Sequence, residues 1–81
     1  MAHVRIMGPL RVMAGGVETV EIEARNVHAL LAALSERFPD LAPVIEDGVA
    51  LAIDGEIFQD ALLHPIKPDS EVHVLPMFAG G

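Results

Sequence analysis

The alternation of apolar and polar residues is clearest over residues 18–23, where Val20 and Ile22 fall on one side and polar residues on the other. A period of two residues predicts a β-strand with one face on the core and one in water. Residues 4–7 are also β-prone and end at the turn signal Gly8-Pro9. We expect these strands to form an antiparallel hairpin. Between them, residues 10–14 form either a short turn or a strand extension, and Gly15-Gly16 supplies a reversal.

A helical period follows Asn26, which is a good N-cap residue. Apolar residues recur three and four positions apart and define one helix face, at Val27, Leu30, Leu31, Leu34 and Phe38. Pro39 disfavours helical geometry at the residue before it, so we expect the helix to end at Phe38. Residues 40–47 suit a short second helical turn, with Asp40 as its cap, Pro43 in its first turn and Gly48 at its end.

The second half of the chain predicts three more strands. Residues 49–53 are an apolar run that stops at the tight-turn pair Asp54-Gly55, and residues 56–58 read as a very short strand. Residues 59–70 contain two prolines and are expected to be irregular. We expect three apolar residues to hold this segment to the core, namely Leu62, Leu63 and Ile66. Residues 71–75 form the last strand, with Val72 and Val74 facing inward.

This order of elements predicts an α+β fold, in which one main helix covers one face of a mixed sheet of four to five strands. The first and last strands are expected to lie side by side at the centre of the sheet. We therefore expect a single domain over residues 1–81, with a flexible tail over about 76–81.

Composition narrows the classes of function. The chain has 81 residues, of which 52% are hydrophobic, and a formal net charge of −7, so it is a globular acidic domain and an unsuitable partner for nucleic acid. It contains no cysteine, which excludes disulfides, a thiolate nucleophile and zinc–cysteine clusters. The sequence shows neither a signal peptide nor an apolar run long enough to span a bilayer, so we expect no membrane partner and a cytoplasmic location.

The sequence gives little support for a catalytic or metal-binding site. The spacing of the four histidines matches no ligand motif, although His3 and His73 are candidates for neighbours on adjacent central strands. Surface histidines are the favoured interpretation, and no metal is expected. Ser35 and Ser70 lie in a helix and a loop without the glycines of a nucleophile elbow. We therefore expect a protein that is not an enzyme.

Two surfaces are candidates for partner contacts. Leu75, Met77 and Phe78 are large apolar residues at the exit of the last strand, where exposure is costly. Phe78 either contacts a partner or folds back on the core. The exposed side of the central strands adds Arg5, Met7 and His73 to Leu75. The acidic residues at 18, 21 and 23 form either a solvated strand face or a docking surface for a basic partner.

The last two residues, Gly80-Gly81, have no side chains and therefore form a thin, unrestrained segment. They are either a frayed terminus or a thread that presents the α-carboxylate to a confined site. The α-carboxylate has an ordinary pKa of about 3.5 and is charged at neutral pH.

The whole chain resembles the ubiquitin-like sulfur carriers of the MoaD/ThiS family, and its length and tail are most similar to the small subunit of molybdopterin synthase. The resemblance rests on residues 64–72, which run through a strand to Pro76, and on the closing Gly80-Gly81. Weaker support comes from Leu10-Arg11, Ala14-Gly15-Gly16 and residues 38–41. The sequence departs from the family pattern at Ser70 and Met77. Members of this family fold as a β-grasp.

The resemblance implies a carrier protein. The carboxylate of Gly81 is then adenylated by a ubiquitin-activating-type adenylyltransferase that uses ATP, while Gly80 allows the tail to thread into that enzyme. A sulfur donor converts the adenylate into a thiocarboxylate, which delivers sulfur to an accepting biosynthetic enzyme such as the large subunit of molybdopterin synthase. No cofactor is bound by the carrier itself. Molybdopterin synthesis is the preferred pathway. The alternatives are a thiamin thiazole, cysteine or other sulfur pathway, and an unmodified β-grasp interaction module.

Overall fold

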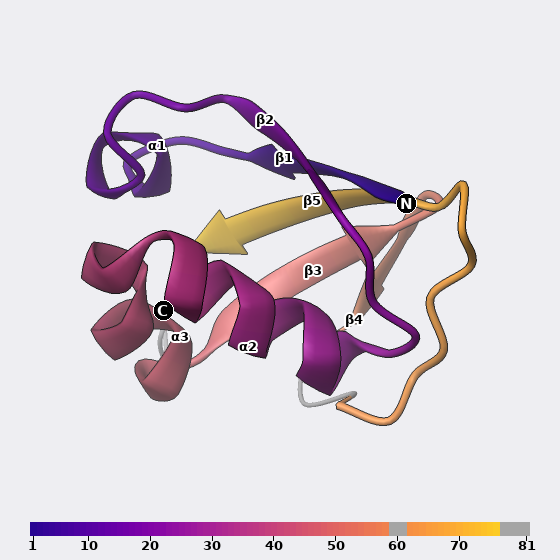
Figure 1. The fold of residues 1–81 in the computed structure, drawn as a ribbon. Coiled ribbons are helices and arrows are strands. Elements are labelled where there is room, and N and C mark those ends of the chain that lie inside the picture. Colours follow the sequence, from indigo (N-terminus) through magenta and orange to yellow (C-terminus); the bar gives the residue numbers. More distant parts are fainter. Residues whose placement is uncertain (59–61, 77–81) are drawn as a thin grey trace.

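The computed structural model describes residues 1–58 and 62–76, so residues 59–61 and 77–81 lie outside it. A single five-stranded sheet has the order β2-β1-β5-β3-β4 (Figure 1). The strands are β1 Ala2–Ile6, β2 Thr19–Ile22, β3 Val49–Ile53, β4 Glu56–Phe58 and β5 Glu71–Pro76. The predicted α+β class is confirmed.

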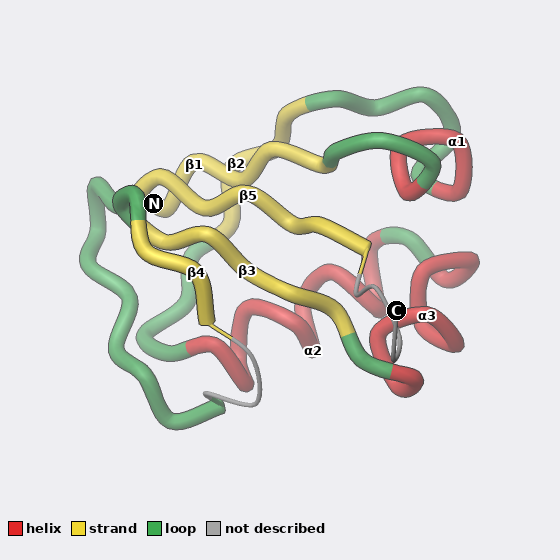
Figure 2. Tube along the Cα trace, turned by 180° about the vertical axis from the view of Figure 1, so that it is seen from behind, coloured by secondary structure: helices red, strands yellow, loops and turns green. Residues whose placement is uncertain are grey.

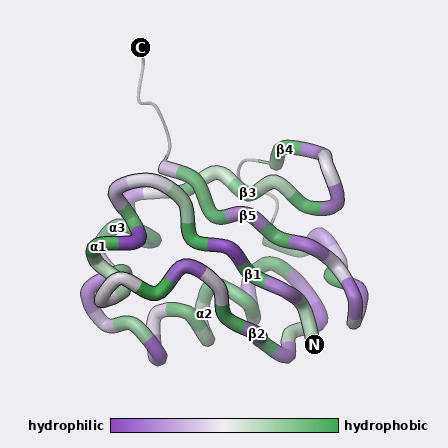
Figure 3. The backbone as a smooth tube through the Cα atoms, turned by 90° about the horizontal axis from the view of Figure 1, so that it is seen from above, coloured by the Kyte–Doolittle hydropathy of each residue, from purple (hydrophilic) through white to green (hydrophobic). Residues whose placement is uncertain are grey.

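The first and last strands are neighbours at the centre of the sheet, as the order of elements predicted. β1 pairs with β5 in parallel, with Val4 opposite Val72, and it pairs with β2 as an antiparallel hairpin, with Val4 opposite Val20. β5 also pairs antiparallel with β3, which makes β5 the middle strand. Apolar and polar residues alternate along β1 (Figure 3) because one face of the sheet is packed and the other is not.

The main helix, α2, runs over Val27–Arg37 and packs across one face of the sheet (Figure 1). Its predicted N-cap is confirmed, because the Oδ1 atom of Asn26 accepts a hydrogen bond of 2.8 Å from the backbone N–H of Ala29. The carbonyl oxygens of Leu62 and His64 accept hydrogen bonds from the N–H groups of His28 and Val27. The segment before β5 therefore satisfies donors that a free helix end would leave unpaired.

The three shorter helical pieces are α1 Leu10–Met13, the 3-10 turn η1 Pro39–Leu41, and α3 Ala42–Asp47. The first decides between the two alternatives for residues 10–14, because the chain makes a helical turn and not a strand extension. Pro43 lies in the first turn of α3, as predicted. The prediction that Asp40 caps α3 was wrong, since Asp40 lies inside η1 and its side chain caps nothing.

The core lies between α2 and the sheet. The largest fully buried side chains are Val4, Ile6, Leu30, Leu34, Leu41, Val72 and Val74. They come from β1, β5, α2 and η1, so these elements meet at the centre of the core. Burial of this surface is the main favourable contribution to folding.

Two of the three residues predicted to hold the segment before β5 do not do so. Leu62 is 47% exposed and Leu63 is 86% exposed, whereas Ile66 is buried as predicted. This segment is held by its backbone, through the bonds to α2 and through the N–H of Ile66, which donates to the carbonyl of Arg25. Its leucine side chains are therefore not needed for anchoring.

The start of β5 is fixed to the turn between β3 and β4 by a small polar network. The Ser70 hydroxyl donates to Oδ2 of Asp54 at 3.1 Å and accepts from the backbone N–H of Lys67 at 3.0 Å. The other carboxylate oxygen of Asp54 accepts from the N–H of Glu71 at 3.0 Å. These two hydrogen bonds, first that from Glu71, hold the pKa of Asp54 below its ordinary value. Both residues of this turn, Asp54 and Gly55, have positive φ, which suits a tight hairpin.

The outer sheet face as a candidate partner-binding surface

The described helices lie on one side of the sheet, so the opposite face is bare across the part of the chain that the structure covers (Figures 1 and 2). We call this the outer face. Strand register and alternation place on it the side chains of His3, Arg5, Thr19, Glu21, Ala50, Ala52, Ile57, Glu71, His73 and Leu75. This uncovered sheet face is a candidate surface for a partner.

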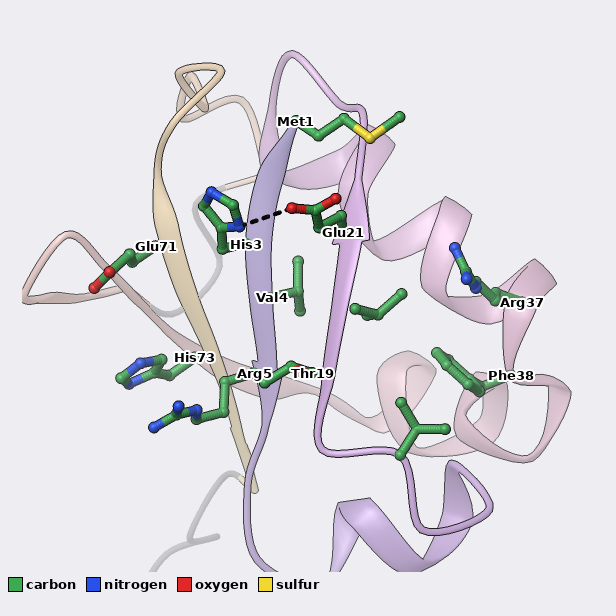
Figure 4. A pocket seen from close by; sticks show the side chains of 12 residues that line it. Met1, His3, Val4, Arg5, Thr19, Glu21, Arg37, Phe38, Glu71 and His73 are labelled. Carbon is green, nitrogen blue, oxygen red and sulfur yellow. Dashed lines mark ion pairs between the residues drawn. The ribbon is translucent and has the colours of Figure 1, made fainter.

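One end of the outer face carries a charged row. His3 stands opposite Glu21 on β2 and opposite Glu71 on β5, so a histidine lies between two carboxylates. Its Nδ1 atom is 3.2 Å from Oε1 of Glu21 (Figure 4). Both side chains are more than half exposed, and such a pair contributes little to stability. The row therefore contributes mainly to surface charge.

The next row contains the cation of Arg5. Arg5 stands between Thr19 and His73, neither of which carries a carboxylate, and its guanidinium lies beside the His73 ring (Figure 4). The ion pairs between described residues are His3 with Glu21 and Arg11 with Glu18, so Arg5 has no such partner within the described ranges. In a protein with a net charge of −7, the Arg5 guanidinium is a local charge of opposite sign.

The rest of the outer face is apolar. His73 is followed across the sheet by Ala52 and then by Ile57, which is 68% exposed, and Leu75 stands opposite Ala50. Ala50 is only 6% exposed, although it does not belong to the core cluster. Small side chains on β3 thus lie between larger ones on β4 and β5. We call this strip, made of Ala50, Ala52, Ile57 and Leu75, the alanine strip.

An open hollow follows the β2 edge of the described structure. It is lined by His3, Arg5, Glu71 and His73 on the outer face, and by Arg37 and Phe38 beyond β2 (Figure 4). No group of three or more metal-ligating side chains occurs among the residues that the structure describes. His3 and His73 lie on adjacent strands but are not opposite each other, since His3 pairs with Glu71. Ser70 is engaged by Asp54 and Lys67, so its hydroxyl has a structural role.

The predicted site residues separate into two groups. Arg5, His73 and Leu75 lie on the outer face, and the N–H of Met7 continues the β1–β5 ladder by donating to the carbonyl of Val74. The other four, Met77, Phe78, Gly80 and Gly81, lie outside the described residues. β5 extends one residue further than expected, through Pro76, which stands opposite Val49. Pro76 is the last described residue before the C-terminal glycines, so β5 is the element that immediately precedes residues 77–81.

A sequence profile described as the ThiS family matches residues 4–81, which is nearly the whole chain. The chain belongs to the ThiS family. The family resemblance inferred from the sequence is thus confirmed, and with it a relationship to ubiquitin-like sulfur carriers. No curated protein matches the chain significantly.

Solved structures confirm the β-grasp fold of this ThiS-family chain. The small archaeal modifier protein 1 of Methanosarcina acetivorans is 23% identical, with a TM-score of 0.83 over 99% of this chain and 95% of that one. A chain of the BexX/CysO complex of Amycolatopsis orientalis is 22% identical, with a TM-score of 0.78 over the full length of both. A chain of the complex of subunits 1 and 2 of the molybdopterin-converting factor of Helicobacter pylori is 28% identical, with a TM-score of 0.71 over 99% and 97%.

Sequence reasoning missed the alanine strip. The strand over 49–53 is apolar at every position, so its alternation is invisible and Ala50 and Ala52 could not be assigned to a face. Ile57 lies in a strand of three residues, which is too short for a periodic signal. The usable signal was the pair of alanines two positions apart within a strand.

No described helix has the length and apolar character needed to cross a membrane.

Proposed function

We propose that this protein is a sulfur carrier whose C-terminal carboxylate, on Gly81, is converted to a thiocarboxylate and delivers sulfur to a biosynthetic enzyme. The observation that carries the proposal is that the ThiS family match runs through residue 81, so both glycines belong to the region shared with the family. The central position of β5, which leads directly into the tail, supports it further. The outer face provides a docking surface next to that exit.

The chemistry requires activation before sulfur transfer. A carboxylate oxygen is a poor leaving group, so the carboxylate first attacks the α-phosphorus of ATP to give an acyl-adenylate and pyrophosphate. A hydrosulfide equivalent from a sulfur donor then attacks the carbonyl carbon, releases AMP and leaves a thiocarboxylate. Gly80 and Gly81 have no Cβ, so the tail fits a narrow channel in the activating enzyme. ATP is bound and consumed by that enzyme and not by the carrier.

The proposed partners are an adenylyltransferase, a sulfur donor and an accepting enzyme. Leu75, Arg5, Met7 and His73 on the described surface, with Met77 and Phe78 in the tail, are the proposed contacts. Molybdopterin synthesis is the preferred pathway, because the relative with 28% identity is a molybdopterin-converting factor. A cysteine or thiamin thiazole pathway is the alternative, and the fold similarity to a chain of the BexX/CysO complex keeps it under consideration.

Intact mass spectrometry tests the reaction. The chain is incubated with the adenylyltransferase encoded in the same genome, ATP and sulfide, and replacement of one oxygen by sulfur adds about 16 Da. We expect this gain for the wild-type chain and not for a chain that lacks Gly81, while both give the same circular dichroism spectrum. An active adenylyltransferase that leaves the wild-type mass unchanged would refute the proposal.

Pathway choice is tested with the thiocarboxylated chain. It is mixed in turn with the large subunit of molybdopterin synthase and with a thiazole-forming enzyme, and complexes are detected by size-exclusion chromatography. We expect a stable complex with the molybdopterin synthase subunit. Binding to the thiazole-forming enzyme alone would reassign the pathway and leave the carrier function intact.

A further inference from the structure

β2 is an edge strand, and no described strand lies beyond it. The direction of its main-chain groups follows from its antiparallel pairing with β1. The N–H of Ile6 donates to the carbonyl of Glu18, and bonded pairs recur at every second residue of an antiparallel ladder. The even-numbered residues of β2 therefore bond to β1. The N–H and C=O groups of Thr19 and Glu21 point the other way, toward the open edge.

The hollow described above, of about 1060 Å³, lies along this edge. Figure 4 shows Thr19 and Glu21 on β2, with Arg37 and Phe38 at the end of α2 across from them. Val20 and Phe38 supply apolar surface on the side of β2 that faces the helix. Neighbouring strands lie about 4.8 Å apart, so an extended segment placed in the hollow comes within hydrogen-bonding distance of β2.

The charges along β2 decide what kind of segment fits. Residues 17–23 contain three carboxylates, on Glu18, Glu21 and Glu23, and no basic side chain. Glu18 is paired with Arg11 at 3.3 Å, whereas the partner of Glu21 is the exposed side chain of His3. Like charges on edge strands oppose pairing between identical chains. A basic side chain directly across from a carboxylate is favourable, so the edge suits a basic strand better than a second copy of itself.

From the open edge, the hollow and the charges we infer that β2 accepts an extended partner segment as a further antiparallel strand, in which basic and apolar side chains alternate. The main chain of this segment pairs with Thr19 and Glu21, as in other cases of strand addition to a sheet edge. Its basic side chains lie on the outer face beside Glu21. Its apolar side chains turn toward Val20 and Phe38. This inference goes beyond the proposed function, because neither the tail nor its thiocarboxylate takes part.

The test uses a synthetic peptide of eight residues in which lysine and valine alternate, with both ends blocked. It is titrated into the ¹⁵N-labelled full chain and followed by NMR, which gives both the dissociation constant and the amides that it affects. We expect the largest shifts at Thr19 and Glu21. The opposite edge, formed by β4 over Glu56–Phe58, is the internal control and is expected to shift little.

Two modified peptides separate strand pairing from simple charge attraction. One carries an N-methyl group on every lysine amide and the other on every valine amide, so both keep the charge and the sequence. Residues that exchange both hydrogen bonds in an antiparallel pair have their side chains on the same face, so the lysines opposite Glu21 use their amides for pairing. We expect lysine N-methylation to weaken binding by about tenfold or more, and valine N-methylation to change it by less than about twofold.

Variants of the protein test the same contacts from the other side. Thr19→Pro removes one outward N–H and keeps the ladder with β1, a position at which edge strands tolerate proline. We expect it to weaken binding about fivefold, whereas Thr19→Ala, which keeps the N–H, stays within about twofold. Glu21→Gln should weaken binding more than Glu36→Gln, which makes the same change in net charge on the exposed side of α2. Circular dichroism and melting temperatures verify that each variant is folded.

Equal weakening by the two N-methylated peptides would overturn the inference, since net charge alone would then drive binding. An absence of peptide binding, or shifts that spare Thr19 and Glu21, would overturn it as well. Self-association of the chain through the same amides would identify a second copy as the occupant and would also contradict the inference. If Thr19→Pro is unstable, the modified peptides decide the question with the wild-type chain. The proposed function keeps its separate readout, the gain in mass, so either proposal can fail without the other.

Discussion

Ser70→Ala removes a hydroxyl that connects three parts of the fold. This hydroxyl donates to Asp54 in the β3–β4 turn, accepts from the N–H of Lys67, and belongs to the residue that immediately precedes the middle strand β5. Ser70 is only 3% exposed, and it is the one described polar residue in the buried class. The substitution leaves the apolar core intact, so its effect reports on the polar network.

The expected loss of unfolding free energy depends on whether water replaces the Ser70 hydroxyl as the partner of Asp54 and of the Lys67 N–H. A hydrogen bond contributes about 0.5–1.5 kcal/mol net, and a partner left buried and unpaired costs about 1–3 kcal/mol. The Asp54 carboxylate and the loop at Lys67 are exposed, so water can replace the lost contacts. We therefore expect only the net contribution of the two hydrogen bonds to be lost, about 1–2 kcal/mol of unfolding free energy for both together. In a domain of this size each kcal/mol lowers the melting temperature by roughly 4–8 °C.

Urea unfolding followed by circular dichroism at pH 7 measures this loss, and calorimetry gives the fall in melting temperature. Ser35→Ala is the matched control, because Ser35 lies in the last turn of α2, where alanine is a better helix former. A Ser70→Ala variant as stable as Ser35→Ala would show that the network does not form in solution. A loss well above 3 kcal/mol would show that the former partners are not rehydrated.

Three further changes test other contacts. Asn26→Ala removes the N-cap of α2 and should cost about 1 kcal/mol in urea unfolding, whereas Asn26→Ser should recover most of it. The wild type should be more stable than Asp54→Asn, with the full difference in unfolding free energy above pH 5. The difference should decline as the pH falls through the lowered folded pKa of Asp54, because a protonated carboxyl loses the bonds that depress this pKa. A difference that does not depend on pH would contradict this cause. Gly48→Ala should cost on the order of 1–3 kcal/mol, since φ there is 117°; unchanged stability would mean that the α3–β3 connection relaxes.

Sequence patterns correctly predicted those parts of the fold that depend mainly on residues close together in the sequence. The period along α2 and the N-cap at Asn26 were read correctly, and so was the alternation at Val20 and Ile22. The central pairing of β1 with β5 followed from general rules of sheet topology. In each case a strong local signal agreed with the tertiary structure.

The errors fall where tertiary contacts decide. Leu62 and Leu63 are apolar and were expected to face the core, yet the segment is held by backbone hydrogen bonds to α2 that the sequence does not reveal. Asp40 is a good capping residue, but the 3-10 turn that begins at Pro39 incorporates it before α3 starts. The surroundings of Ala50 and Ala52 depend on which strands flank β3, and this is a property of the sheet order.

The two ends of β5 have separate roles, and the geometry explains why one strand can serve both. Ser70 and Leu75 are five residues apart, which is roughly 16 Å along a strand, and sites at this distance usually contribute independently. The start of β5 is fixed by the Asp54 network and its flanks by β1 and β3, so its other end is a rigid support for the residues that follow. The hydrogen bonds of the Asp54 network therefore lie at the start of β5, whereas Leu75 lies near its other end, opposite Ala50 on the outer face.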